Sequence, residues 1–150
     1  MKEIKIELHD AKETIALGFK IGQHLNAKDV IVLEGDLGAG KTTLTKGIGK
    51  ALNIEKMINS PTFTIMKQYN GDLPLYHFDA YRLEGQKEDL GFDEYFYGEG
   101  ISVIEWAQYI IDDIPSEYLK IEIKHADNGR IAYLYPVGLH YKEICEEVFL

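Results

Sequence analysis

Residues 30–52 have the sequence VIVLEGDLGAGKTTLTKGIGKAL, which is the strongest indication of fold class in this chain. It opens with an apolar run typical of a buried strand, and it ends with the apolar spacing of a helix. Between them, Gly35, Gly40, Lys41 and Thr42 stand at the spacing GxxxxGK(S/T), which is that of a P-loop. Glycine is needed there because successive backbone N–H groups must curl around one anion, and side chains would block the approach. The stretch therefore predicts a phosphate-binding loop.

The motif also predicts what each side chain contacts. Lys41 should reach the β- and γ-phosphates, the Thr42 hydroxyl should bind Mg²⁺, and Thr43 should donate to the α-phosphate. The same nucleotide site is expected to include the residues before Lys41, namely Asp36, Leu37, Gly38, Ala39 and Gly40. The sequence contains no Asn-Lys-x-Asp segment, with which common GTPases recognise guanine, so ATP is the expected nucleotide.

Two acidic residues end apolar stretches. Asp79 follows LYHF and Glu105 follows ISVI, each where a buried strand should emerge beside the phosphates. A P-loop enzyme needs one carboxylate for the Mg²⁺ shell and often a second to orient the attacking water. Lys41, Asp79 and Glu105 are therefore the predicted catalytic residues. The competing interpretation is an ordinary acid at a strand end, such as an Asp79 that pairs with Arg82.

The segment NSPTFT, residues 59–64, comes where many P-loop proteins have a switch that senses the γ-phosphate. Pro61 stiffens it, and the hydroxyls of Ser60 and Thr62 could face Mg²⁺ or the phosphate. A Ser-Pro turn that leads into a strand is the alternative. His77 lies between Tyr76 and Phe78, and we expect a packed or hydrogen-bonded histidine with no catalytic role.

The remaining pattern predicts an α/β fold, a single P-loop domain over residues 1–150 with a mixed central sheet flanked by helices. Further strands are expected at residues 4–8, at 101–106, and in two hairpins that turn at Asn70-Gly71 and at 127–129. Helices are expected after Asp10, with Leu17, Ile21 and Leu25 buried, and after the P-loop, with Leu44, Ile48 and Leu52 buried. A short helix containing Ile144 and Val148 should end the chain.

Residues 83–100 are acidic and aromatic, and we expect a short helix and a mobile loop there. Tyr95, Phe96 and Tyr97 cluster in this loop, where exposed aromatic residues are typical of a surface that binds a partner protein.

The composition limits the classes of function. A net charge of -9 argues against a broad nucleic-acid-binding face, because such faces neutralise phosphates with Lys and Arg. Cys145 is the only cysteine, which excludes an intrachain disulfide. The sequence shows neither a signal peptide nor an apolar run long enough to span a membrane, so a cytoplasmic protein without membrane contact is expected.

The sequence resembles the TsaE (YjeE) family, small P-loop ATPases of bacterial tRNA threonylcarbamoyladenosine biosynthesis. The resemblance covers nearly the whole chain, and four motifs carry it in order: GDLGAGKTTLTKGI, SPTF, YHFDAYRL and IEW. It implies an ATPase that works beside the partners TsaB and TsaD, which install a threonylcarbamoyl group on an adenosine of tRNA. Contact with tRNA is then expected only through that protein complex.

The resemblance also implies roles for single residues. Thr42 and Glu105 match the family's Mg²⁺-binding residues, and Asp79 matches the acid needed for hydrolysis, which looks like the one that orients water. Trp106 is expected near the nucleotide and Arg130 around its base. The family's switch matches Ser60, Pro61, Thr62 and Phe63.

Two other classes of function remain open. A small P-loop kinase usually clamps donor and acceptor with several arginines, and this chain has only Arg82 and Arg130. A nucleotide-gated binding module with little turnover is disfavoured by Asp79 and Glu105 without being excluded. For an ATPase that acts on a protein complex, the expected contacts are residues 60–64 and 93–100.

Overall fold

The computed structural model describes residues 3–36, 38–61, 65–85 and 91–149. They contain a seven-stranded sheet of order β1-β7-β6-β2-β5-β4-β3. The strands are β1 (Ile4–Leu8), β2 (Val30–Gly35), β3 (Met66–Tyr69), β4 (Leu75–Asp79), β5 (Ile101–Glu105), β6 (Tyr118–Ala126) and β7 (Gly129–Val137). Strands β6, β2, β5 and β4 run parallel, while β1, β7 and β3 are antiparallel to their neighbours. The expected α/β fold with a mixed sheet is confirmed.

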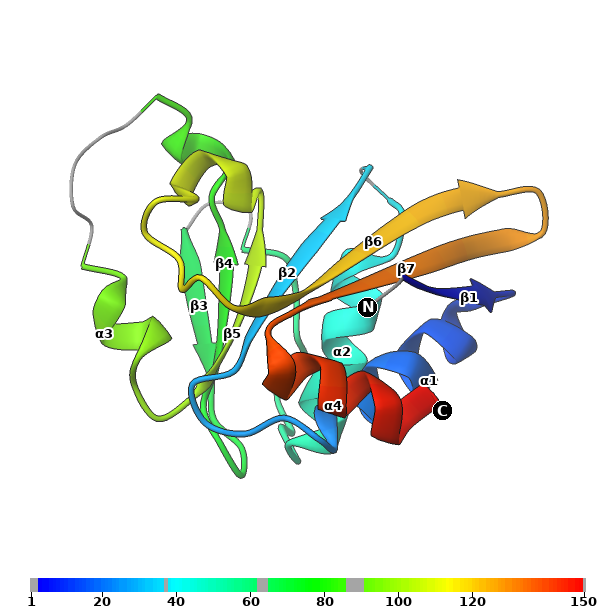
Figure 1. The fold of residues 1–150 in the computed structure, drawn as a ribbon, viewed down its shortest axis with the longest axis horizontal. Coiled ribbons are helices and arrows are strands. Elements are labelled where there is room, and N and C mark those ends of the chain that lie inside the picture. The colour runs from blue at the N-terminus through cyan, green and yellow to red at the C-terminus, as the bar shows by residue number, and fades with distance from the viewer. Residues whose placement is uncertain (1–2, 37, 62–64, 86–90, 150) are drawn as a thin grey trace.

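Helices cover both faces of the sheet (Figure 1). On one face lie α1 (Ala11–Gly22), α2 (Lys41–Ala51) and α4 (Leu139–Phe149). The other face is covered, over β2, β5 and β4, by the short helix α3 (Asp93–Phe96) and the 3-10 turns η1 (Tyr81–Leu83) and η2 (Ala107–Ile110). The unbroken apolar run of β2 follows from this arrangement, because alternate side chains of the strand enter opposite cores.

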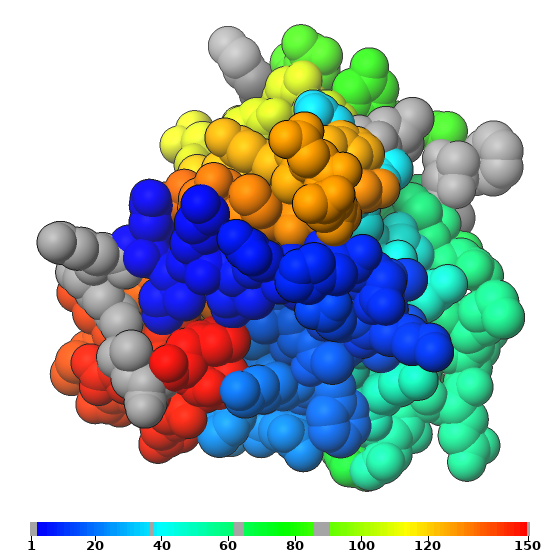
Figure 2. All heavy atoms as spheres, turned by 90° about the vertical axis from the view of Figure 1, so that its right-hand side faces the viewer, coloured from blue at the N-terminus to red at the C-terminus, as the bar shows by residue number. Residues whose placement is uncertain are grey.

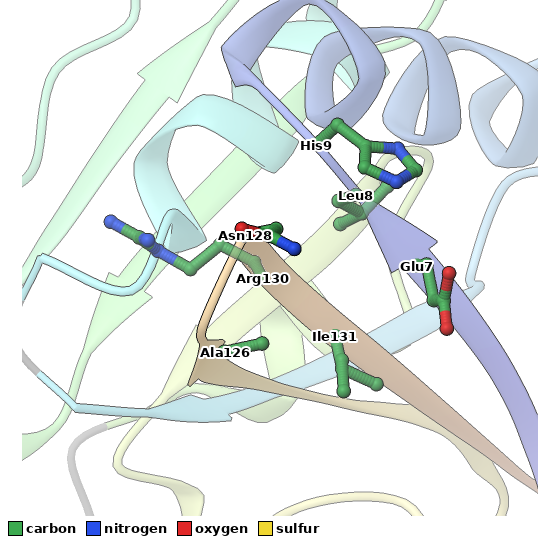
Figure 3. A pocket seen from close by; sticks show the side chains of 7 residues that line it. All are labelled: Glu7, Leu8, His9, Ala126, Asn128, Arg130 and Ile131. Carbon is green, nitrogen blue, oxygen red and sulfur yellow. The ribbon is translucent and has the colours of Figure 1, made fainter.

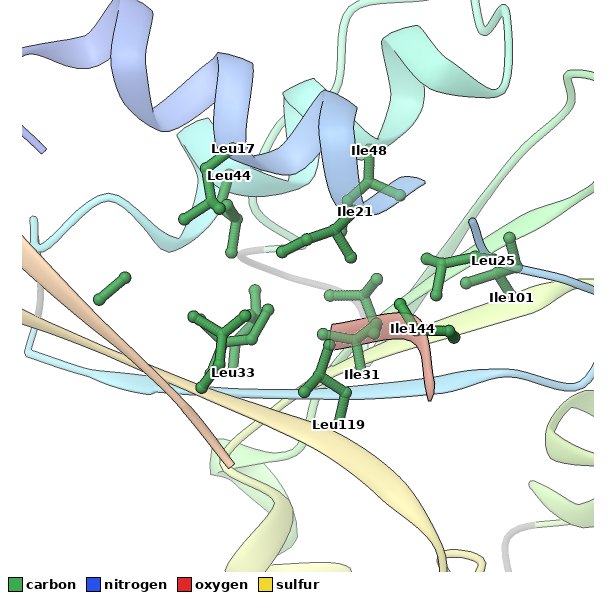
Figure 4. Close-up of a cluster of buried hydrophobic side chains, with 14 of the residues drawn as sticks. Leu17, Ile21, Leu25, Ile31, Leu33, Leu44, Ile48, Ile101, Leu119 and Ile144 are labelled. Atoms are coloured by element: carbon green, nitrogen blue, oxygen red, sulfur yellow. The ribbon is translucent and has the colours of Figure 1, made fainter. Parts of the chain in front are cut away.

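The larger core lies between the sheet and the helices α1, α2 and α4. Leu17 and Ile21 of α1 and Leu44 and Ile48 of α2 pack over side chains from β2, β5 and β6 (Figure 4). Helix α1 begins as predicted, since the side chain of Asp10 accepts a hydrogen bond from the Glu13 N–H at 2.9 Å. The helix ends at Gly22, so Leu25, expected on its apolar stripe, is buried from the segment that follows it.

The connection between β3 and β4 differs from the expected two-residue turn at Asn70-Gly71. Tyr69 pairs with Leu75, so five residues, 70–74, join the strands. The loop is longer because it binds the end of α2: the N–H of Asp72 donates to the Leu52 carbonyl at 2.7 Å. Thr62, Phe63 and Thr64, where this hairpin was expected to begin, lie outside the described residues.

The aromatic residues of α3 are not the exposed surface that the sequence predicted. Phe96 is 1% exposed, and Tyr95 packs edge-on against Tyr76 with ring centroids 5.0 Å apart. Phe96 is buried and Tyr95 half-buried because both cover the aromatic side chains of β4 on the face that α2 does not reach. Tyr97, the third aromatic residue of the predicted cluster, is 58% exposed.

The C-terminal part of the chain agrees with the prediction. Strands β6 and β7 form a hairpin in which Ala126 pairs with Gly129 across a two-residue turn, and α4 follows. Figure 2 shows β1 and α1 in blue below this hairpin, in orange, with α4, in red, beside α1. Helix α4 is tied to the sheet by Tyr141, whose hydroxyl accepts a hydrogen bond from the Val30 N–H at 2.9 Å. Within the described parts of the chain, no helix is long and apolar enough to cross a membrane.

Candidate functional site

The P-loop connects β2 to α2 and has the backbone that its glycines predict. Gly35, Gly38 and Gly40 have φ angles of 151°, 80° and 113°, a region that residues with a Cβ atom rarely adopt. Lys41 is the first residue of α2, and no described side chain caps the helix. The N–H groups and the dipole of this helix start are therefore left for an anion.

Register brings the predicted acids to the same edge of the sheet. Glu105 pairs with Leu33 on one side and with Asp79 on the other, so both acids lie at the carboxyl ends of parallel strands beside the P-loop. Ligands of open α/β sheets bind at such edges. Asp79 is half-buried, and its Oδ1 accepts a hydrogen bond from the Tyr81 N–H at 3.0 Å.

Glu105 is 5% exposed and has two partners. Its Oε1 lies 3.4 Å from Lys41 Nζ, and its Oε2 lies 2.7 Å from Nε2 of the fully buried His77. Burial by itself would raise the pKa of Glu105, but the hydrogen bond from His77 and the charges nearby outweigh it, so the pKa lies below its ordinary value. The carboxylate is therefore ionised at neutral pH beside the cation that the motif directs to phosphate.

Trp106 and Arg130, both expected around the nucleotide, lie on opposite sides of the P-loop. Lys41 Nζ sits 5.3 Å from the centre of the Trp106 ring, and both residues line a hollow of about 230 Å³ with Glu34, Gly35 and Glu122 among its walls. On the other side Arg130 donates to the Gly38 carbonyl at 3.3 Å. This contact joins the β6–β7 hairpin to the loop.

A second hollow, of about 190 Å³, lies between the P-loop and the β1–α1 junction. Gly38, Gly40 and Thr43 line it from one side, and the opposite wall comes from segments far away in sequence, with His9, Asp10, Thr14, Gly129 and Arg130. A neighbouring hollow of about 200 Å³ shares His9 and Arg130 (Figure 3). In this view Arg130 points away from Ile131 and toward the loop before α2.

The structure also describes Thr42, Ser60 and Pro61 among the predicted site residues. Thr42 is the second residue of α2 and is half-buried. Ser60 and Pro61 follow Asn59, whose N–H and carbonyl both bond the Tyr69 hydroxyl at 3.2 Å. Leu37, Thr62 and Phe63 lie outside the described residues.

The contact that His77 makes with Glu105 was not predicted. We expected a packed or hydrogen-bonded histidine, which is confirmed, but its bond is to Glu105. The sequence did contain a signal for this contact, because His77 is a polar residue in the apolar strand that ends at Asp79. No comparable pattern pointed to His9 or Thr14, because the β1–α1 junction is distant from the P-loop in sequence.

Comparison with known proteins identifies the family. Residues 8–132 match the family model described as "Threonylcarbamoyl adenosine biosynthesis protein TsaE". The chain is 49% identical over 150 residues to the tRNA threonylcarbamoyladenosine biosynthesis protein TsaE of Bacillus subtilis (strain 168), covering 99% of this chain and 95% of that one. It is 46% identical over 132 residues to the protein of the same name from Nostoc sp., covering 83% and 80%.

A solved structure is similar along the whole chain. The crystal structure of YdiB from Bacillus subtilis superposes with a TM-score of 0.86 at 42% identity, covering 98% of this chain and 94% of that one. The profile, the relatives and the fold agree with the four motifs from which the resemblance was inferred. The chain therefore belongs to the TsaE family of tRNA threonylcarbamoyladenosine biosynthesis proteins.

Proposed function

We propose that residues 1–150 act as one ATPase domain in the cytoplasm, which binds and hydrolyses ATP with Mg²⁺ and acts on the TsaB–TsaD complex during tRNA modification. The observation that carries the proposal is the ion pair between Lys41 and the buried Glu105 at the start of α2. It puts a cation suited to phosphate next to a carboxylate suited to a metal ion. The TsaE family is associated with ATP binding, which supports ATP as the nucleotide.

The nucleotide would be held by the P-loop. Backbone N–H groups of residues 36–40 would surround the phosphates, Lys41 would contact the β- and γ-phosphates, and Thr43 would contact the α-phosphate. Trp106 and Arg130 line the hollows on either side of the loop, and we assign both to nucleotide binding.

Thr42 and Glu105 would hold Mg²⁺, and the described residues fit such an ion. Glu105 is ionised, and no group of three or more His, Cys, Asp or Glu side chains converges within the described parts of the chain. This suits Mg²⁺, which usually binds through one or two carboxylates, water and substrate phosphates. The bound ion would neutralise charge on the phosphates.

Asp79 would orient the attacking water from the strand end next to Glu105. Ser60, Pro61, Thr62 and Phe63 would form the switch that responds to the γ-phosphate. The partner would be the TsaB–TsaD protein complex, with tRNA contacted only through it, because a chain with net charge -9 has little cation density for RNA phosphates.

Phosphate release from MgATP, measured with the chain alone, with TsaB–TsaD, and with candidate small-molecule acceptors, tests the proposal. We expect slow release by the chain alone and faster release with TsaB–TsaD. An Asp79→Ala variant should remove the stimulated rate, which controls for contaminating ATPases. Turnover that requires an acceptor would instead indicate a kinase, and no turnover under any condition would indicate a binding module.

A further inference from the structure

His77 lies at a core position whose neighbours in the sheet are aliphatic. It lies in β4 on the same face as Leu75, opposite Val103 of β5, and both of these neighbours belong to the core under α1 and α2. Its side chain is fully buried. A polar ring at such a position costs free energy unless it is hydrogen-bonded, so packing alone does not explain the histidine.

The ring makes one hydrogen bond among the described residues. Nε2 lies 2.7 Å from Glu105 Oε2, while Nδ1 is buried without a partner in the described parts of the chain. An ionised carboxylate only accepts hydrogen bonds, so Nε2 carries the hydrogen and donates it. The single polar contact of His77 is thus directed at one oxygen of Glu105.

The two oxygens of Glu105 therefore have different kinds of partner. Oε2 is held at 2.7 Å by a ring that is locked in the sheet. Oε1 lies 3.4 Å from the amine of Lys41. The side chain of Lys41 is flexible, and its amine is expected to bind phosphate. When Lys41 turns to a nucleotide, Oε1 loses its partner and Oε2 keeps its own.

We propose that His77 is a positioning residue, which holds Glu105 through Oε2 so that Oε1 alone exchanges its partner, from Lys41 in the free protein to Mg²⁺ in the nucleotide complex. The inference rests on the proposed function, because it requires Glu105 to bind the metal ion. Without His77, the carboxylate could rotate and engage Lys41 with both oxygens. Lys41 and Mg²⁺ would then compete for it.

The test compares ATP affinity with Mg²⁺ and with EDTA, by calorimetry, in the full chain and its variants. The ratio of the two dissociation constants measures what Mg²⁺ contributes to binding. His77→Gln and His77→Asn form a matched pair, because both introduce a small amide but only that of Gln can reach the position of Nε2. His77→Leu, which has no polar group, replaces the Asn variant if the latter fails to fold, and thermal unfolding of each variant checks folding.

We expect the Mg²⁺ contribution to fall about 10- to 100-fold in His77→Asn or His77→Leu, the range seen when a partner of a metal ligand is removed. His77→Gln should retain most of it, and affinity in EDTA should change little in any of them. A merely structural role would lower thermal stability and reduce both affinities together. An undiminished Mg²⁺ contribution in the Asn and Leu variants, or equal losses in Gln and Asn, would overturn the proposal.

Glu105→Gln separates this inference from the function on which it rests. If that variant loses the Mg²⁺ contribution while His77→Asn and His77→Leu keep it, the role of His77 is wrong and the metal site stands. If Glu105→Gln itself keeps the whole contribution, Glu105 is not a metal ligand, and both the role of His77 and the assignment of Mg²⁺ to Glu105 fail.

Discussion

Glu105 and Asp79 are register partners at the ends of adjacent strands, yet their surroundings differ. Glu105 is buried between a histidine and a lysine that keep it ionised, whereas Asp79 is half-buried and accepts a backbone hydrogen bond at a turn. Two acids in unlike environments are the usual arrangement when they have separate roles. The buried, ionised one suits a metal ion and the more accessible one suits a water molecule.

Alanine substitutions should therefore give different phenotypes. Glu105→Ala should weaken Mg²⁺-dependent ATP binding by about 10-fold or more and also reduce hydrolysis, because a charge-assisted contact is lost. Asp79→Ala should slow hydrolysis by about 10²- to 10⁴-fold and leave binding largely intact. Calorimetry and phosphate release measure the two effects. The opposite pattern would require the two roles to be exchanged.

Phe96 should matter for stability more than for partner binding. Phe96→Ala should lower the free energy of unfolding by about 3–5 kcal/mol, since it empties a fully packed position against Phe78. The neighbouring Tyr97→Ala, at an exposed position, should change it by less than about 0.5 kcal/mol. Urea unfolding of the two variants makes the comparison. Equal effects would show that α3 does not cover the core as described.

Residues of the site could be predicted where they lie close together in sequence. The P-loop residues were recognised from spacing, since the loop draws its N–H groups from consecutive positions. The contact of His77 with Glu105 joins residues 28 positions apart, and that of Arg130 with Gly38 joins residues 92 apart. Those pairs depend on strand order and register, which hydrophobic periodicity does not encode.

At the scale of elements, a buried hydroxyl of α4 makes a hydrogen bond to the sheet. Tyr141, 4% exposed, accepts the Val30 N–H at the first residue of β2. Tyr141→Phe should lower the free energy of unfolding by about 1–3 kcal/mol, because it leaves that buried N–H without an acceptor. Urea unfolding near neutral pH measures the difference. A change near zero would mean that water or another group replaces the hydroxyl.

The same hydroxyl should make this stability depend on alkaline pH. Burial raises the pKa of Tyr141 to about 12 from an ordinary value of 10.0, against the lowering effect of the Val30 N–H. A group whose pKa is raised by folding stabilises fully below its unfolded pKa and loses that stabilisation as pH rises toward its folded pKa. The advantage of the wild type over Tyr141→Phe should thus be constant below pH 10 and shrink between pH 10 and about 12. An advantage that grows over this interval would contradict the burial of the hydroxyl.

Among the helices and strands, hydrophobic periodicity predicted best those that have one buried face and one face in water. The apolar stripe of α1 was recognised because one face of the helix is buried and the other faces water. The β3–β4 loop was predicted too short because its length is set by hydrogen bonds to α2, a tertiary contact. Residues 93–100 were predicted to form an exposed loop because they are rich in acidic residues, although Tyr95 and Phe96 of α3 pack against the core.

At the scale of the whole molecule, the two ends of the parallel strands have different surroundings. The carboxyl ends carry the P-loop, Asp79 and Glu105. The amino ends lie near the segment after α3, where the Gly100 carbonyl accepts the Lys28 N–H just before β2. A partner that senses the nucleotide should contact the carboxyl end, so the expected contact at residues 93–100 is disfavoured by the fold.

Two exposed tyrosines at opposite ends of the sheet test this expectation. Tyr81 is 55% exposed and packs against Trp106 beside Lys41, and Tyr97 is 58% exposed near α3. Tyr81→Ala should reduce the stimulation of ATP hydrolysis by TsaB–TsaD, expressed relative to the basal rate of each variant, whereas Tyr97→Ala should not. A loss confined to Tyr97→Ala would restore the contact at α3.

We expect one site, at the carboxyl end of the sheet, to bind ATP with Mg²⁺ through Lys41. Calorimetric titration of MgATP into the wild type and Lys41→Ala measures this binding, and unfolding midpoints show that both proteins are folded. We predict one ATP bound per chain, and an affinity about 10- to 100-fold lower, or undetectable, in Lys41→Ala, because the side-chain cation on the phosphates is lost. A folded wild type that binds no MgATP, or a Lys41→Ala variant with wild-type affinity, would contradict the account.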